Sequence, residues 1–222
     1  MKIEAEKISK TFFRKTAGAN YFYAVSPLSL EIVSGSVTVL MGRSGSGKTT
    51  LLNMLSGILE PTGGKVRLDN TDLYSLNDRE LSRLRNERIG VVPQARSAVD
   101  TLTVMENILL PATLYGKPAP AEHAVHLMEE FDIAHLADAM PRELSGGELR
   151  RMAIIRAIVQ NPDFLFADEP TGDLDDENTQ KALSFLQAYA HQQGKAVLIV
   201  THENDALKYA DRLLKMEKGQ IA

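Results

Sequence analysis

The chain has 222 residues, of which 44% are hydrophobic, and a net charge of −4. This length and composition suit one well-packed core, or one core with an attached lobe. The acidic balance argues against a nucleic-acid partner, because nucleic-acid binders usually carry a basic face. The absence of cysteine excludes disulfides and thiolate metal sites. No apolar run approaches the roughly 20 residues that a membrane-spanning helix needs, and residues 1–9 do not read as a signal peptide.

The first third of the chain predicts strands and turns. Alternating or continuous apolar residues indicate strands at residues 2–8, 28–33, 37–41 and 65–68. The run at residues 37–41 is typical of a strand buried on both faces. The spacing of Leu51, Leu52 and Leu55 predicts a helix from Thr49 to Gly57. Asp69 to Asp72 is better explained as a hairpin turn than as a calcium loop.

The middle of the chain is helical in pattern. Residues 78–88 predict a charged helix, and the helical pattern of residues 103–158 is expected to break at Pro111, near residues 118–120 and at Pro141. This stretch predicts a helical lobe inserted into an α/β core. The strand pattern returns at residues 164–167 and 196–200, around a long helix at 176–193. Residues 213–222 are expected to carry no further domain.

Four apolar strands are followed at once by residues able to bind phosphate or metal, and they are predicted at residues 37–41, 89–92, 164–167 and 196–200. The residues that follow them are Gly42, Gln94, the pair Asp168 and Glu169, and His202. Parallel sheets bind ligands at the carboxyl ends of their strands. The four segments are therefore expected to converge on one site.

Residues 42–49 read Gly-Arg-Ser-Gly-Ser-Gly-Lys-Thr and fit the phosphate-loop pattern G-x-x-x-x-G-K-[ST]. The glycines let successive backbone N–H groups point at phosphate oxygens, and the next helix adds its positive end. Lys48 is predicted to reach the β and γ phosphates of Mg-ATP, and the Thr49 hydroxyl to bind Mg²⁺. A plain Gly/Ser turn would not need a strand before it and a helix after it. The predicted nucleotide-binding residues are Gly42, Arg43, Ser44, Gly45, Ser46, Gly47, Lys48, Thr49 and Thr50.

The acidic pair and two polar residues complete the predicted chemistry. Asp168 fits a Walker B ligand of Mg²⁺, and Glu169 fits the group that orients or deprotonates the attacking water. A solvated acidic turn before Pro170 is the alternative. Gln94 could contact Mg²⁺ or the water, although alone it is more simply a loop glutamine. His202 alone is more simply a surface histidine.

A second glycine motif, Leu-Ser-Gly-Gly-Glu at residues 144–148, precedes a helix that should run to about Gln160. Ser145 and Glu148 form the capping-box pattern. Capping does not explain the adjacent glycines, Gly146 and Gly147. Ser-Gly-Gly at a helix N-terminus leaves N–H groups able to hold a second anion.

In order and spacing these motifs, with Asp173 to Asp175, resemble those of ABC-type ATPases over essentially the whole chain. The resemblance implies an α/β fold: a P-loop NTPase (RecA-like) core with an N-terminal antiparallel β subdomain and an inserted α-helical subdomain. The single domain, 1–222, would divide into a core of about 1–92 and 161–222, and a Gln94-loop and helical region of about 93–160.

The resemblance also implies roles for residues in a head-to-tail dimer. Ser145, Gly146 and Gly147 of one subunit would contact the γ-phosphate bound by the other. Asp173 to Asp175 would form the loop linking the two sites, although Asp175 also fits a helix N-cap. His202 would sense the γ-phosphate. The alternative of a kinase or GTPase on a P-loop fold is contradicted by the Ser145 motif.

The family places an aromatic ring on the adenine, and Phe12 is the best match in this chain. Phe13 could serve instead, and Tyr21 or Tyr23 are further alternatives. Core packing is the competing interpretation for each of these rings.

Residues 101–108, 169–175 and the insertion-like 16–23 resemble bacterial macrolide-export, lipoprotein-release and antimicrobial-peptide-resistance ATPases, and the cell-division member of that group. This implies a separate membrane-spanning partner, a second ATPase subunit (the same chain or a close relative), and a location at the cytoplasmic face of the cell membrane. The alternative is a regulatory or cell-division ATPase without a transporter. Pro93 and Asp100 depart from the group's usual phenylalanine and proline, which leaves the identity of the partner open.

Overall fold

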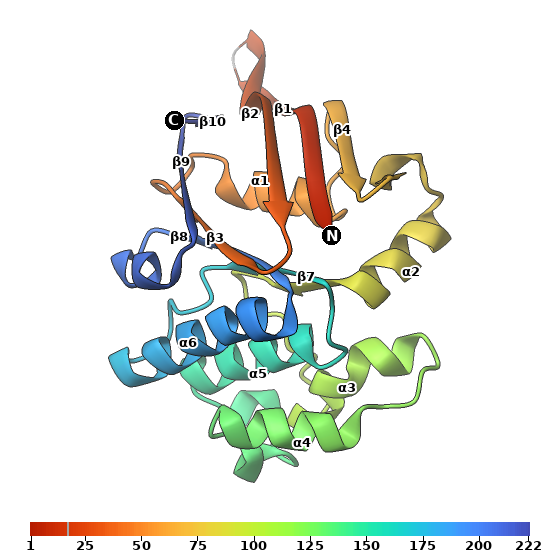
Figure 1. The fold of residues 1–222 in the computed structure, drawn as a ribbon, viewed down its shortest axis with the longest axis vertical. Coiled ribbons are helices and arrows are strands. Elements are labelled where there is room, and N and C mark those ends of the chain that lie inside the picture. Colours follow the sequence, from red (N-terminus) through yellow and green to blue (C-terminus); the bar gives the residue numbers. More distant parts are fainter. Residues whose placement is uncertain (17) are drawn as a thin grey trace.

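A computed structural model describes residues 1–16 and 18–222, and among these residues a pair of β-sheets and their helices form stacked layers (Figure 1). An antiparallel sheet has the strand order β2-β1-β4-β5, with β1 (Lys2–Thr16), β2 (Gly18–Val33), β4 (Gly63–Leu68) and β5 (Thr71–Asp72). The other sheet has the order β10-β9-β3-β8-β7-β6, with β3 (Ser36–Met41), β6 (Ile89–Val92), β7 (Phe164–Asp168), β8 (Ala196–Thr201), β9 (Arg212–Glu217) and β10 (Gln220–Ile221). The α-helices are α1 (Lys48–Leu55), α2 (Asp78–Arg88), α3 (Val104–Leu114), α4 (Ala121–Glu130), α5 (Gly146–Ile158) and α6 (Asp176–Gln193). Short 3-10 turns lie at Leu73–Ser75, Ala134–Leu136, Pro141–Glu143 and Asn204–Tyr209.

The second sheet is parallel from β9 through β6, and only the short β10 pairs antiparallel to β9 within the described residues. Successive side chains of its central strands enter different cores. Val37 and Val39 of β3 belong to the core that includes residues of helices α3 to α6, whereas Leu40 belongs to the core that includes residues of the antiparallel sheet. A strand that is buried on both faces in this way must be apolar throughout, which explains the continuous runs in the sequence.

Helix α1 lies between the two sheets, and α5 and α6 cover the opposite face of the parallel sheet, with α4 farther out (Figure 1). Leu51, Leu52 and Leu55 of α1 are almost completely buried in the core between the sheets. This packing fixes the start of α1 next to the carboxyl end of β3. The predicted α/β arrangement, including the antiparallel and helical regions, is therefore confirmed.

Two predictions about the elements are wrong. Helix α3 continues through Pro111, because proline removes a single N–H and only one further turn follows before the helix ends at Leu114. The chain also forms β9 and β10 after the strand that was expected to be the last. In β9 only Leu214 and Met216 are buried, so its apolar pattern is too short to predict a strand.

The N-terminal hairpin is longer than the predicted strands. Strand β1 runs on from Ile8 to Thr16, and register shifts near Ile8 and Lys10 interrupt the alternation on which the prediction depended. Most of the insertion-like residues 16–23 form the end of the β1–β2 hairpin, and Ala17 lies outside the described residues. The predicted hairpin at Asp69 to Asp72 is present: Asp69 and Asn70 form the turn, and Thr71 and Asp72 form β5, which pairs antiparallel to β4.

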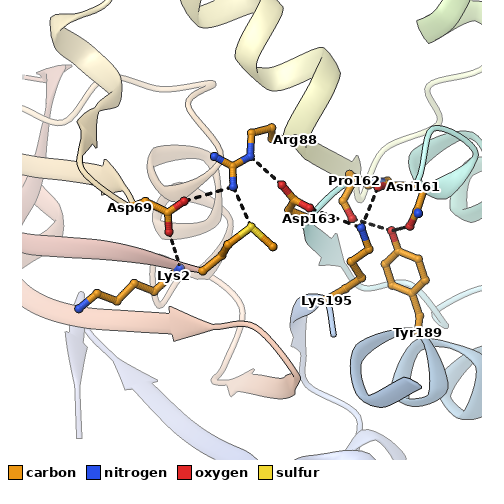
Figure 2. Close-up of polar contacts among 9 residues, drawn as sticks. Lys2, Asp69, Arg88, Asn161, Pro162, Asp163, Tyr189 and Lys195 are labelled. Carbon is orange, nitrogen blue, oxygen red and sulfur yellow. Dashed lines mark hydrogen bonds and ion pairs between the residues drawn. The ribbon is translucent and has the colours of Figure 1, made fainter. Parts of the chain in front are cut away.

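A polar cluster joins the two sheets at the amino ends of β7 and β8 (Figure 2). The guanidinium of Arg88, at the end of α2, donates to Asp163 over 2.7 Å and to Asp69 over 3.2 Å. The backbone N–H of Lys2 donates to Asp69 over 2.9 Å, and the Lys195 ammonium donates to Asp163 over 3.4 Å. The cluster lies at the opposite end of the parallel strands from the residues with predicted chemistry.

Candidate functional site

The phosphate loop lies between the carboxyl end of β3 and the start of α1, as the strand–loop–helix pattern predicts. Gly45 and Gly47 have φ values of 78° and 105°, which are conformations that favour glycine. A Cβ atom at Gly47 would also lie 2.2 Å from the carbonyl oxygen of Ala24. Gly47 is therefore required both by its backbone conformation and by the close approach of β2.

The cationic group of the loop is Lys48, whose side chain curls over the loop. Its Nζ donates to the carbonyl oxygens of Gly42 at 2.7 Å and Arg43 at 3.3 Å. Helix α1 has no side-chain N-cap and no acidic residue in its first turn. The positive charge of the Lys48 ammonium and the positive end of the helix dipole therefore favour a phosphate group at the same position.

Asp168 ends β7 and is 2% exposed. Burial raises the pKa of its carboxyl group, while a hydrogen bond from the Thr49 hydroxyl and the nearby Lys48 charge act to lower that pKa. The structure therefore brings the Thr49 and Asp168 oxygens together. Such oxygens are the ligands that Mg²⁺ takes at phosphate sites, so the donor set fits this ion.

Glu169 is held in one orientation by β8 and the residues that follow it. Its φ is 49°, and its backbone N–H donates to Val200 over 2.8 Å. The Thr201 hydroxyl donates to Oε2 over 2.9 Å, and Nδ1 of His202 lies 2.8 Å from Oε1. The hydrogen bond to Glu169, followed by its negative charge, raises the pKa of the His202 imidazole. Sequence reasoning missed Thr201, although its place at a strand end beside His202 was visible.

A cleft of about 840 Å³ brings most of the predicted residues together. The predicted residues that line it are Phe12, Arg43, Ser44, Gly45, Gly47, Lys48, Thr49, Thr50, Gln94, Asp168, Glu169 and His202. Gly42 and Ser46 do not line this cleft, but they line a neighbouring one of about 750 Å³ that shares Arg43, Ser44 and Gly45 with it. Sequence reasoning also missed Phe22, Ala24, Lys218 and Gly219, which line the first cleft.

The aromatic residues of the β1–β2 hairpin lie on different faces of it. Phe12 is paired across the strands with Phe22, their ring centres being 6.1 Å apart. Phe13 and Tyr21 form a separate pair at 5.2 Å and do not line the cleft. Phe12 and Tyr23 do line it. The pairing with Phe22 depends on the hairpin register, which the sequence alone did not indicate.

The second glycine motif does not line the cleft of its own chain. Ser145 caps α5 and forms the predicted reciprocal bonds with Glu148, at 2.7 and 3.3 Å. Ser145 and Gly146 are exposed, and a Cβ atom at Gly146 would lie 3.5 Å from Cβ of Asp173. Asp175 caps α6, as its alternative interpretation predicted. The motif thus faces outward beside the Asp173 segment.

The fold and the cleft together define a P-loop enzyme that hydrolyses a nucleotide. The chain matches the family model described as "ABC transporter" over residues 25–172, so it belongs to the ABC transporter family and is an ABC-type ATPase. It is 37% identical to the lipoprotein-releasing system ATP-binding protein LolD of Leptospira interrogans, over 96% of this chain and 90% of that protein. It is 36% identical to the macrolide export ATP-binding/permease protein MacB of Brucella abortus, over 99% of this chain but only 34% of that protein.

A solved structure also resembles the chain closely. The dimeric structure of MJ0796, an ABC transporter cassette, matches with a TM-score of 0.92 and 32% identity, over 99% of this chain and 96% of that one. These relatives agree with the predicted resemblance to the macrolide-export and lipoprotein-release group. No helix among the described residues is long and apolar enough to cross a membrane.

Proposed function

We propose that the chain is the ATP-hydrolysing subunit of a transporter whose membrane-spanning component is a separate chain. The observation that carries the transporter role is the match to nearly all of LolD, an ATP-binding protein of a releasing system. The separation of the cleft from Ser145 and Gly146, which are exposed on the same chain, supports a second subunit. A second ATPase subunit, either the same chain or a close relative, would supply Ser145, Gly146 and Gly147 to the γ-phosphate. The dimeric form of the MJ0796 cassette supports this arrangement.

The chemistry follows from the residues of the cleft. The ATP phosphates would lie on the loop N–H groups, and the Lys48 ammonium would exchange the Gly42 and Arg43 carbonyls for phosphate oxygens. Thr49, Asp168 and Gln94 would hold Mg²⁺, which supplies positive charge against the phosphates. With its oxygens fixed by Thr201 and His202, Glu169 is oriented to position the attacking water and accept its proton.

His202 and Phe12 complete the proposed nucleotide site. The imidazole of His202 lies beside Glu169 at the edge of the cleft, with 68% of its side chain exposed. From there it could reach a γ-phosphate. Phe12 would stack on the adenine at the hairpin side of the same cleft. No nucleic-acid partner is part of this proposed function.

In the transporter, different regions of the chain would carry the chemistry and the contact with the membrane-spanning partner. Residues 1–92 and 161–222 would form the catalytic core, and residues 93–160 would carry the Gln94 loop and the helical subdomain toward the membrane partner. LolD is named an ATP-binding protein of a releasing system, whereas MacB combines an ATP-binding region with a permease. The match to nearly all of LolD supports a separate permease, which would place this chain at the cytoplasmic face of the cell membrane.

Substitution of Glu169 by Gln tests the chemistry. The variant should bind Mg-ATP as the wild type does and should accumulate as a dimer in size-exclusion chromatography. Its turnover should fall by about 10²–10⁴-fold, the range that general base catalysis contributes. Glu177→Gln is the matched control, because Glu177 lies on the surface with a side chain that is 81% exposed. Turnover by Glu169→Gln equal to that of this control would reject the role of Glu169.

Native purification tests the transporter role. The chain should co-purify with a multi-spanning membrane protein that alters its ATPase rate. An active ATPase that never associates with membranes would reject the transporter role, and a septal location without a permease would favour a cell-division module.

A further inference from the structure

Arg150 on α5 connects segments that are far apart in the sequence. This residue is 9% exposed. Its Nη1 donates to the carbonyl oxygen of Pro93 over 2.8 Å, and its Nη2 donates to that of Gln94 over 2.9 Å. The same Nη2 lies 3.3 Å from Oδ2 of Asp173. One guanidinium therefore joins α5, the start of the Gln94 loop and the segment that precedes α6.

A second arginine of the same helix holds the later residues of that loop. Nη1 of Arg156 donates to the carbonyl oxygen of Ser97 over 2.8 Å, and its Nη2 donates to the Ser97 hydroxyl. Helix α5 thus holds residues 93–98 at two points, mainly through main-chain carbonyls. A planar guanidinium with several N–H groups suits such contacts better than an ammonium does. The loop follows β6 in the chain, and these hydrogen bonds also connect it to α5.

The contacts of Arg150 bear on both halves of the proposed nucleotide site. Gln94 lines the cleft, and its backbone carbonyl is one of the two to which Arg150 donates. Helix α5 begins at Gly146, directly after Ser145, and Gly146 lies against Asp173. A cavity of about 200 Å³ lies between the loop and α5, lined among others by Gln94, Arg150 and Asp173. The loop therefore has room to shift if the guanidinium is removed.

We propose that Arg150 is a positioning residue that makes the Gln94 loop, the Ser145 motif and Asp173 move as one unit. A nucleotide that engages Gln94 in one subunit would then set the orientation of the Ser145 motif, which the same chain offers to its neighbour. This inference rests on the proposed function, because it assumes that Gln94 and Ser145 act at opposite ends of two shared sites. It assigns to Arg150 no contact with ATP itself.

Two substitutions test the inference in the full chain. Arg150→Met keeps the apolar stem and removes every donor, whereas Arg150→Lys can keep one carbonyl contact but not all three. Arg142→Met, at an exposed position nearby, is the control. We expect Arg150→Met to bind ATP with an unchanged Kd and to lose about 10–100-fold in kcat, as misplacement by about 1 Å does elsewhere. Arg150→Lys should recover some of that loss.

Hydrogen exchange separates positioning from general stability. In Arg150→Met the amides of residues 94–98 and 171–175 should exchange faster together, while those of the parallel sheet stay protected. In a Glu169→Gln background, Arg150→Met should also weaken ATP-driven dimerisation without changing ATP binding by the monomer. Wild-type kcat, dimerisation and exchange in Arg150→Met would overturn the inference. A uniform loss of protection with a matching fall in ATP affinity would overturn it too, because it would show a merely structural role.

The outcomes also distinguish the inference from the proposed function. If the wild type fails to hydrolyse ATP, or if Glu169→Gln hydrolyses it normally, the proposed function fails. If both behave as expected and Arg150→Met is indistinguishable from Arg142→Met, only the inference on Arg150 fails.

Discussion

The polar cluster around Arg88 (Figure 2) allows a quantitative prediction about stability. Arg88 contacts Asp163 at 2.7 Å and Asp69 at 3.2 Å, and the three side chains are 30%, 23% and 37% exposed. Exposed ion pairs contribute about 0.2–1 kcal/mol each, and breaking a fully buried pair costs about 3–5 kcal/mol. The partly buried Arg88 contacts lie between these limits. Arg88→Met should therefore reduce the free energy of unfolding by about 2 kcal/mol.

Thermal unfolding followed by circular dichroism can measure this change. For a chain of this size, 1 kcal/mol corresponds to a shift of about 2–4 °C in Tm, so Arg88→Met should lower Tm by about 4–8 °C. Arg83→Met is the matched control on the same helix, because Arg83 pairs with Glu87 at 3.0 Å but is 73% exposed. The control should shift Tm by less than about 3 °C. Equal shifts in the two variants would refute the assignment of a joining role to the Arg88 cluster.

Three further predictions concern the cleft. Gly47→Ala should abolish ATP binding, measured by calorimetry, because the left-handed backbone and the Ala24 carbonyl leave no space for a methyl group; near-normal binding would contradict the loop geometry. Phe12→Ala should raise the Kd for ATP about tenfold, since stacking on a base contributes about 1–3 kcal/mol, whereas Phe13→Ala should leave the Kd unchanged; the reverse result would place the adenine elsewhere. The raised pKa of His202 means that its pairing with Glu169 stabilises the fold below the ordinary imidazole pKa, and that this contribution is lost as pH rises through the raised value. The difference in Tm between wild type and His202→Gln should accordingly shrink as the pH rises above the ordinary imidazole pKa, and a constant difference would contradict the pairing.

Local chemistry explains which elements could be predicted from the sequence. Helices at residues 78–88 and 176–193 carry their own boundary signals: Asn77 and Asp175 cap their N-termini, and Gly194 ends α6 in a left-handed conformation. The phosphate loop also carries a local signal, because Gly45 and Gly47 have left-handed backbone conformations that favour glycine. Strands β9 and β10 have no such signal. Strand β9 exists because it pairs with β3, a contact between distant residues.

Arg150 shows the same limit within the site. The sequence drew attention to Ser145 and Glu148, but an arginine on a helix is ordinarily exposed and attracts no notice. Its burial depends on carbonyls of Pro93 and Gln94, which precede it by 57 and 56 residues. Because the acceptors are backbone carbonyls, the side chains of Pro93 and Gln94 do not indicate this contact. Only the folded chain shows that the carbonyl oxygen of Pro93 accepts a hydrogen bond from α5.

The acid–histidine pair depends on the register of the parallel sheet. Strands β7 and β8 pair Asp168 with Val200, so Glu169, which follows β7, lies next to Thr201, the last residue of β8, and His202, which follows it. The left-handed backbone of Glu169 then turns its carboxylate toward the other two. A slip of one residue would send alternate side chains to opposite faces, separating Glu169 from Thr201 and Asp168 from Thr49. The buried apolar residues of both strands, which enter separate cores on each face, forbid that slip. The same apolar runs that made the strands recognisable in the sequence therefore also bring Glu169, Thr201 and His202 together.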